Sequence, residues 1–213
     1  MYNTILFDLD GTLTDSGRGI TNSVAYALTE FGLKFESKEE LRCFIGPPLI
    51  KIFMQSYNLS EETARALVKK YREYYSVNGI FENDLYENID YLLSSLSSMG
   101  KKLILATSKP EHFAIKILEH FGIAKYFSYV CGATMDEKRT EKDAVIAYAL
   151  ESAGISDVKD VLMVGDREYD VLGAKSFGMD SVGVLYGYGS REELTTAGAT
   201  YIAETVTDIL KFV

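Results

Sequence analysis

The sequence predicts an α/β protein in which a doubly wound parallel sheet carries an inserted all-helical domain. Short apolar runs of the kind found in strands recur along the chain. From the second run onward, helical patterns separate them, as they do in parallel βαβ units. One long interval near the N-terminus contains helical patterns only. These three observations together favour a sheet interrupted by a helical insertion.

Six apolar runs have the length and composition of strands. They cover residues 4–8, 102–107, 127–131, 160–165, 181–184 and 200–203. A helical face that ends at Gly122 follows the second run, and another that ends at Gly154 follows the third. A further helix is expected over residues 85–99, before the second run. The alternation predicts a parallel sheet covered by helices.

The interval 15–84 breaks this alternation, because it is far longer than one crossover and shows no strand pattern. An apolar stripe from Ile20 to Phe31 predicts one helix. Ser60 stands where it can cap a charged helix that runs to about Val77. We therefore expect two domains, a core of residues 1–14 and 85–213 and a helical cap of residues 15–84.

Charge and composition narrow the classes of partner. The 213-residue chain has 22 Lys and Arg against 31 Asp and Glu, a formal net charge of −9. This balance argues against a nucleic-acid polymer or an anionic membrane as partner. No run approaches the roughly 18 apolar residues of a membrane span, and the N-terminus lacks a secretory signal, so we expect a cytoplasmic protein. We expect it to be a monomer or a homodimer. Cys43 and Cys131 are too few for a disulfide framework or zinc, and we expect reduced thiols packed in the fold.

Polar residues follow three of the predicted strands. Asp8 and Asp10 come at the end of the first, Thr107 ends the second, and Asp166 and Asp170 follow the fourth. Carboxyl ends of parallel strands meet at one edge of the sheet, where doubly wound folds bind ligands, so these side chains are expected to converge. Several carboxylates in one crevice repel each other and need a cation to stay ionised. Hard oxygen ligands favour Mg²⁺.

Read in order, these residues resemble the four motifs of haloacid dehalogenase-like phosphohydrolases. The motifs are Asp8-Leu9-Asp10-Gly11-Thr12, Thr107, Lys142, and Gly165-Asp166 with Asp170. The resemblance covers essentially the whole chain, including the helical insertion, and is closest to the phosphoglycolate phosphatase and 5'-nucleotidase-like branch. It implies a Rossmann-like core and a Mg²⁺-dependent phosphatase that hydrolyses a small phosphomonoester through an aspartyl-phosphate intermediate.

The resemblance also implies the catalytic roles. Asp8 is the implied nucleophile, and Asp10 the acid that protonates the leaving alcohol and then the base that activates water. Thr107, Ser108 and Lys142 are implied to hold the phosphoryl oxygens and to offset the charge that develops on them. A role for Thr107 and Ser108 in capping the following helix is the alternative.

The implied metal site uses residues from two strand ends. Asp8, Asp166 and the backbone carbonyl of Asp10 are the implied ligands. Asp170 is implied to orient the ligands or Lys142. Alternatively, Asp170 is an acid placed early in a helix, where the dipole favours it.

One loop of the expected cap is a candidate for substrate recognition. Gly46-Pro47-Pro48-Leu49 interrupts the helical patterns and is rigid. In relatives of this shape the corresponding loop contacts the leaving group, which points to Gly46, Pro47 and Leu49. A plain turn between two helices is the alternative.

Two departures from the family pattern matter for the site. Many relatives have Lys-Pro where this chain has Lys142-Asp143, and Lys138 and Arg139 lie close enough to compete for the phosphate-binding role. This chain has Gly165-Asp166-Arg167-Glu168 where Gly-Asp-Ser or Gly-Asp-Thr is commoner in the family. The difference changes the surroundings of the implied metal ligand Asp166.

Other activities fit less well. Dehalogenases of the family lack the second acid, so Asp10 favours phosphoryl transfer. Sugar phosphomutases carry a cap histidine near the position of Ile20, which disfavours that branch. A receiver domain that accepts phosphate on Asp8 and signals is shorter and lacks the insertion. A dinucleotide-binding domain needs a glycine-rich turn where this chain has acids.

Overall fold

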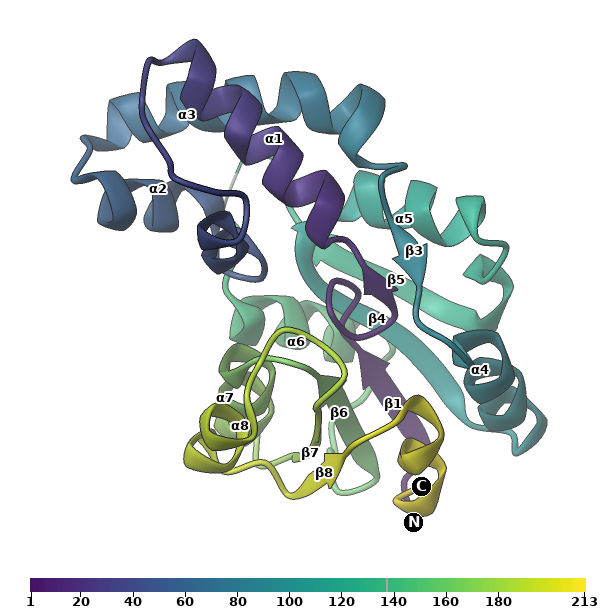
Figure 1. The fold of residues 1–213 in the computed structure, drawn as a ribbon. Coiled ribbons are helices and arrows are strands. Elements are labelled where there is room, and N and C mark those ends of the chain that lie inside the picture. The colour runs from purple at the N-terminus through teal and green to yellow at the C-terminus, as the bar shows by residue number, and fades with distance from the viewer. Residues whose placement is uncertain (137) are drawn as a thin grey trace. The chain divides into compact units, whose positions relative to one another are not determined.

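The computed structural model describes residues 1–136 and 138–213 (Figure 1). The chain divides into two compact units. We call Met1–Thr14 with Leu85–Val213 the core unit, and Asp15–Asp84 the inserted unit.

The core unit contains a six-stranded parallel sheet, which confirms the predicted α/β fold. Its strands are β1 (Thr4–Phe7), β4 (Lys102–Pro110), β5 (Phe127–Ala133), β6 (Val161–Gly165), β7 (Asp180–Val184) and β8 (Tyr201–Ala203). Each corresponds to one of the predicted strands, with ends displaced by a few residues. The largest displacement is in β4, which continues past Thr107 to Pro110.

Strand β1 lies in the middle of the sheet, whose order is β5-β4-β1-β6-β7-β8. Phe7 is paired with Leu105 of β4 on one side and with Val164 of β6 on the other. The chain leaves β1 for β4 on one side and returns later to β6 on the other, so the order reverses at β1. The carboxyl end of β1 is therefore the switch point at which doubly wound sheets bind ligands.

Helices cover both faces of the sheet. They are α4 (Ile89–Ser98), α5 (Glu111–His120), α6 (Lys142–Ser152), α7 (Glu168–Ser176) and α8 (Arg191–Ala197), with short 3₁₀ turns at Ala124–Tyr126 and Val206–Lys211. Figure 1 shows α6 and α7 on one face and α4 and α5 on the other. Alternate strand residues such as Leu6, Ile104 and Met163 pack against Val145 and Ile146 of α6, as the two-residue period of a strand requires.

The inserted unit is helical. It contains α1 (Gly17–Glu30), a 3₁₀ turn at Glu40–Phe44, α2 (Leu49–Tyr57), α3 (Glu61–Tyr74) and a π-helical turn at Tyr75–Gly79. Ser60 caps α3, because its hydroxyl accepts a hydrogen bond from the Thr63 N–H at 3.2 Å. The predicted α-helix to about Val77 is too long, since the last residues form the π turn instead.

Two short strands were not predicted. β2 (Thr14–Asp15) and β3 (Asp84–Leu85) pair with each other, and the chain passes from one unit to the other within each of them. The helix predicted to begin at residue 85 therefore begins only at Ile89. Strands of two residues are too short to show a periodic pattern.

Cys43 and Cys131 are both reduced thiols. Cys131 is buried as expected, but Cys43 is exposed, so the packing prediction is wrong for Cys43. In the part of the chain that the structure describes, none of the helices is long and apolar enough to cross a membrane.

Candidate active site at the carboxyl end of strand β1

Asp8 is the first residue after β1 and lies at the switch point of the sheet. Its backbone N–H continues the sheet by donating to the Val164 carbonyl at 2.9 Å. Because side chains alternate along an extended chain, Asp8 is on the same face as Leu6, which packs beneath α6. The carboxylate is therefore directed toward the first turn of α6, and it is buried.

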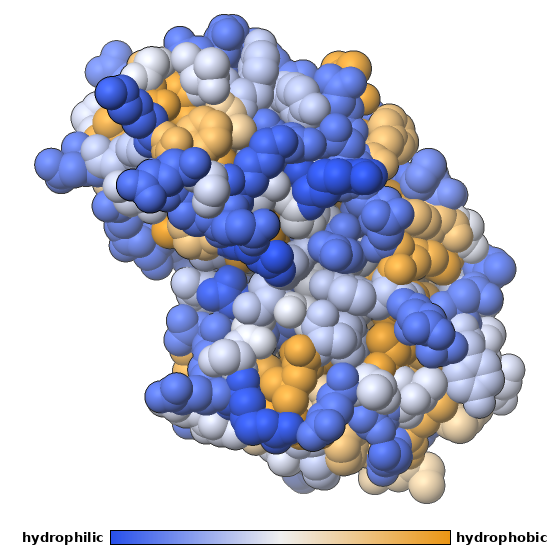
Figure 2. Space-filling model, in the orientation of Figure 1, coloured by the Kyte–Doolittle hydropathy of each residue, from blue (hydrophilic) through white to orange (hydrophobic). Residues whose placement is uncertain are grey.

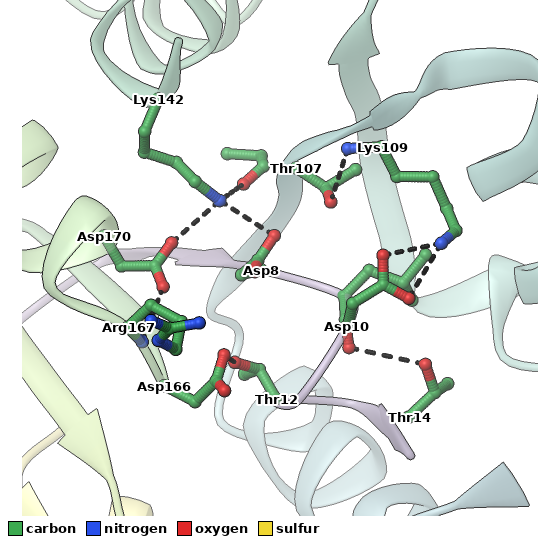
Figure 3. Close-up of polar contacts among 12 residues, drawn as sticks. Asp8, Asp10, Thr12, Thr14, Thr107, Lys109, Lys142, Asp166, Arg167 and Asp170 are labelled. Atoms are coloured by element: carbon green, nitrogen blue, oxygen red, sulfur yellow. Dashed lines mark hydrogen bonds and ion pairs between the residues drawn. The ribbon is translucent and has the colours of Figure 1, made fainter. Parts of the chain in front are cut away.

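Lys142, the first residue of α6, reaches this carboxylate. Its Nζ lies 2.8 Å from Oδ1 of Asp8 and 2.7 Å from Oδ1 of Asp170, and it donates to the Ala106 carbonyl at 3.1 Å (Figure 3). Burial lowers the pKa of Lys142, but Asp170 and Asp8 together outweigh it and raise the pKa above its ordinary value. A helix N-terminus disfavours a cation, so these carboxylates are what hold the lysine there.

The two competing basic residues face other partners. Lys138 is exposed and forms an ion pair with Asp136 at 3.2 Å. The Arg139 guanidinium donates to the Gly132 carbonyl at 3.0 Å and lies 3.6 Å from the centre of the Tyr148 ring. Of the three candidates, Lys142 is the one in contact with Asp8.

Asp166 follows β6 and is fully buried. Its Oδ2 accepts a hydrogen bond from the Tyr188 N–H at 2.8 Å, and its Oδ1 lies 3.4 Å from the Thr12 hydroxyl. Burial raises the pKa of Asp166 well above its usual range, and the charges of Asp170 and Asp8 raise it further. The fold thus holds a carboxylate in a place that disfavours its ionised form.

Asp170 lies in the first turn of α7. Its Oδ2 accepts a hydrogen bond from the Arg167 N–H at 3.1 Å, while its Oδ1 contacts Lys142. Burial raises the pKa of Asp170 to about 6, although Lys142 opposes this shift; Asp8 adds to it. The residue is both an early helix acid and the partner of Lys142, so the two interpretations of the sequence are compatible.

Three carboxylates gather at this point. One oxygen from each of Asp8, Asp166 and Asp170 lies within 4.8 Å of the other two. An oxygen-only donor set of this size fits a hard divalent cation such as Mg²⁺. Burial, and then the charges of Asp170 and Asp8, raise the pKa of Asp166, and a cation bound at this point would oppose that shift.

Asp10 lies apart from these three carboxylates. Its oxygens are 2.8 and 2.6 Å from the Nζ of Lys109, and Figure 3 shows the carboxylate turned toward that lysine. The side chains of Lys109 and Asp10 are 5% and 11% exposed. The sequence analysis did not select Lys109. Its place directly after Thr107-Ser108, at the end of a buried strand, was the available signal.

The remaining predicted residues lie in two places. Thr107 is buried in β4 and its hydroxyl accepts a hydrogen bond from the Lys109 N–H at 3.2 Å, while Ser108 is half-buried beside it. Gly46 and Pro47 lie between the 3₁₀ turn and α2 of the inserted unit, and Leu49 is the first residue of α2. All the predicted residues outside the loop therefore belong to the core unit.

A glycine-containing segment after β7 was also missed. A β-carbon at Gly187 would lie 2.4 Å from Cβ of Asp166, and one at Gly189 would lie 1.9 Å from the Asp166 carbonyl oxygen. Gly11, which has a φ of +83°, approaches Asp166 as closely, since a β-carbon there would lie 2.1 Å from Oδ2 of Asp166. Only glycine fits these three positions while Asp166 keeps its place.

Comparisons with known proteins agree on one family. The family model for haloacid dehalogenase-like hydrolase matches residues 5–184. A 5'-nucleotidase of Pseudomonas aeruginosa is 43% identical over 200 residues, which is 94% of this chain and 90% of that protein. The tyrosine-protein kinase PtkA of Mycobacterium tuberculosis is 38% identical over 95% of this chain and 69% of its own length. A phosphoglycolate phosphatase of Vibrio parahaemolyticus is 31% identical over 98% of this chain and 95% of its own.

The solved structures include a crystal structure of a predicted phosphatase from Clostridium acetobutylicum. It is 50% identical, with a TM-score of 0.97 over 100% of this chain and 98% of that one. With the family model matching most of the chain and the motif residues gathered at one sheet edge, this chain belongs to the haloacid dehalogenase-like hydrolases, among relatives named as phosphatases.

Proposed function

We propose that this protein is a Mg²⁺-dependent phosphatase that hydrolyses small phosphomonoesters through an aspartyl-phosphate on Asp8. The observation that carries the proposal is the contact between Asp8, at the switch point of the sheet, and the buried Lys142. A carboxylate nucleophile divides one difficult displacement at phosphorus into two easier ones. The nearby acids and lysines supply the other groups that this chemistry needs.

In the first step, an Asp8 oxygen attacks the phosphorus and forms an acyl phosphate. The bond from phosphorus to the ester oxygen breaks, and the departing alcohol takes a proton from Asp10. In the second step, Asp10 takes a proton from a water molecule whose oxygen attacks the same phosphorus. The bond to Asp8 breaks, inorganic phosphate leaves, and both aspartates return to their starting states.

Thr107, Ser108 and Lys142 bind the phosphoryl oxygens in this mechanism. The hydroxyls donate hydrogen bonds, and the ammonium of Lys142 offsets the charge that develops as phosphorus is transferred. Asp170 acts through Lys142, because its Oδ1 lies 2.7 Å from the Nζ of Lys142 and keeps the ammonium in place. The alternative, a phosphate bound by Lys138 or Arg139, is disfavoured by the other contacts that these residues make.

Asp8, Asp166 and the backbone carbonyl of Asp10 would hold Mg²⁺. When bound, the ion offsets negative charge on the carboxylates and on the phosphoryl group. Asp166 is kept in position by the Tyr188 N–H and by the close approach of Gly11. Asp170 is the third carboxylate of the cluster. We assign it the role of orienting Lys142, because the two side chains are in direct contact.

The inserted unit is proposed to act as the cap that recognises the rest of the substrate. Gly46, Pro47 and Leu49 would contact the leaving group, and closure of the cap would exclude water during the first step. Candidate substrates are 2-phosphoglycolate, nucleoside monophosphates and sugar phosphates in the cytoplasm. The net charge of −9 disfavours a polyanionic partner.

The test is hydrolysis of p-nitrophenyl phosphate by the purified protein. Asp8→Asn removes the nucleophile, and we expect activity to fall by at least about 10³-fold, because the covalent route is lost. Chelation of Mg²⁺ should also abolish turnover, and adding the ion back should restore it. Asp157→Asn, an exposed acid outside the site, is the matched control and should retain full activity.

Two results would contradict the proposal. Full activity of Asp8→Asn would show that another group is the nucleophile. Full activity of the chelated protein would show that the reaction uses no metal. A phospho-enzyme that persists for minutes in Mg²⁺ with no turnover would instead indicate a receiver-like regulatory domain.

A further inference from the structure

We propose that Lys109 is a positioning residue for Asp10, whose carboxylate it holds in one orientation for proton transfer. The inference rests on the proposed role of Asp10 as acid and base. It concerns a residue that the motifs singled out from the sequence do not include. The argument starts from the contact between the two side chains.

The contact is bidentate and buried. The Nζ of Lys109 lies 2.8 Å from Oδ1 and 2.6 Å from Oδ2 of Asp10. A cation that touches both oxygens restrains the rotation of the carboxylate about its own axis, which a contact to one oxygen does not. With the two side chains 5% and 11% exposed, water screens this pair much less than it screens a surface pair.

The backbone of β4 places Lys109 for this contact. Pairing with β5 changes register between Thr107 and Pro110, which is an irregularity of the kind that re-aims side chains next to active sites. Within this segment, the Lys109 N–H donates to the Thr107 hydroxyl at 3.2 Å. The same short segment therefore places Thr107 in the phosphate-binding position and directs Lys109 to Asp10.

The two aspartates of the first motif, Asp8 and Asp10, contact different lysines. Lys142 contacts Asp8, and Lys109 contacts Asp10. Figure 3 shows Lys142 beside Asp8 and Lys109 beside Asp10, at the two ends of the segment that links the aspartates. Lys109 is therefore engaged with Asp10 rather than directed to the phosphate position beside Lys142.

The leaving group provides the test. p-Nitrophenyl, phenyl and ethyl phosphate have increasingly basic leaving groups, so their departure depends increasingly on a proton from Asp10. kcat/KM reports steps up to the departure of the alcohol. We expect Lys109→Met to lower kcat/KM for ethyl phosphate by about 10 to 100-fold, part of the usual contribution of general acid catalysis. The loss for p-nitrophenyl phosphate should stay below about threefold, because its leaving group needs little protonation.

Two matched variants separate positioning from folding. Lys102→Met removes an exposed lysine from the other end of β4 and should change neither rate. Lys109→Arg keeps a cation and should restore part of the ethyl phosphate rate. Thermal melting and circular dichroism of each variant show whether it folds.

A double-mutant cycle tests whether Lys109 acts through Asp10. In an Asp10→Asn background, Lys109→Met should cost nothing further for ethyl phosphate, because the group it positions is gone. An additive loss, an equal loss for all three esters, or a raised KM with unchanged kcat would overturn the positioning role. The last of these would instead indicate direct binding of phosphate.

The outcomes distinguish this inference from the proposed function. If Asp8→Asn is inactive while Lys109→Met shows an equal loss on all esters, the phosphatase mechanism stands and only the role of Lys109 fails. If Asp10→Asn hydrolyses ethyl phosphate at the full rate, the acid and base assignment fails, and the role of Lys109 fails with it.

Discussion

Two ion pairs of the core unit differ from an ion pair of the inserted unit in how deeply their charges are buried. In the core unit, Lys142 and Lys109 form buried ion pairs with aspartates that are about a hundred residues or more away in sequence. In the inserted unit, Arg65 pairs with Glu61 one helical turn away, at 2.7 Å, with side chains 54% and 60% exposed. Both contacts are short, so distance alone does not separate them.

The difference lies in the free energy of burial. Taking a charge out of water costs several kcal/mol unless a partner compensates for it, about as much as a small domain can spare. Surface pairs contribute about 0 to 1 kcal/mol and can be lost without consequence. A fold that keeps Asp8, Asp166 and Lys142 buried together has therefore retained an arrangement that is costly to stability, and the catalytic roles that we propose for these residues account for it.

The largest effect expected from this comparison is at Lys142. Lys142→Met leaves Asp8 and Asp170 buried without their cation, and breaking such a pair costs about 3–5 kcal/mol. Hydrolysis of p-nitrophenyl phosphate should also fall by at least about 10²-fold, because a charge that stabilises the transferred phosphoryl group is lost. Urea unfolding in a chelator measures the first effect, and steady-state kinetics in Mg²⁺ the second.

The matched control is a lysine that also lies between two carboxylates but at the surface. Lys70 of α3 is 2.8 Å from Glu73 and 3.7 Å from Glu30. Lys70→Met should leave both the unfolding midpoint and the activity unchanged within error. Equal destabilisation by the two substitutions would break the comparison between buried and exposed charge.

The next effect is a pH-dependent stabilisation by Mg²⁺. The pKa of Asp170 is raised to about 6 and that of Asp166 also lies above its ordinary 3.8, so without metal these two groups bind more protons in the folded protein than in the unfolded chain. Their contribution to the free energy of unfolding therefore falls as pH rises from about 4 through 6. Mg²⁺ binds the ionised carboxylates and restores stability, by about 2.7 kcal/mol at a hundredfold excess over its Kd.

Melting temperatures with and without Mg²⁺ at constant ionic strength test this point. We expect the increase caused by Mg²⁺ to be several degrees at pH 7.5 and to shrink toward zero near pH 5, where Asp170 and Asp166 take up protons. Asp166→Asn should remove the increase, whereas Asp157→Asn, at an exposed position, should keep it. An increase of the same size at both pH values would show that the cluster is not the metal site.

The sequence predicts the core unit better than it predicts how the site is completed. The strands are visible as short apolar runs, Asp8 and Asp166 follow strand ends, and Thr107 lies near the end of β4, so their common edge depends only on the parallel order of the sheet. Lys109 could not be placed in this way. Its direction depends on a register change near the end of β4, which results from pairing with β5 rather than from local sequence.

The same reason explains the other misses. Gly187 matters because the segment after β7 passes beside Asp166, which no local pattern records. β2 and β3 are formed by residues almost seventy positions apart, and each is too short for a period to show. Sequence patterns locate elements whose own residues carry an apolar or periodic signal, whereas contacts between distant segments appear only in the folded chain.

The smallest expected effect concerns selectivity in the inserted unit. If Gly46-Pro47-Pro48-Leu49 contacts the leaving group, Leu49→Ala should change the ratio of kcat/KM between 2-phosphoglycolate and a nucleoside monophosphate by about tenfold, the scale of a few methylene contacts. p-Nitrophenyl phosphate turnover should change by less than about twofold, because the chemical groups lie in the core unit.

Ile52→Ala, one turn later in α2 and also half-buried, is the matched control and should leave the ratio unchanged. Gly46→Ala is the stronger test of the loop itself, since Gly46 has a φ of +103°, a region that alanine rarely adopts, so the loop must rearrange. Equal losses on all substrates for Leu49→Ala and Ile52→Ala would mean that the loop serves only to join two helices. A change of preference confined to Leu49 and Gly46 would assign catalysis to the core unit and choice of substrate to the inserted unit.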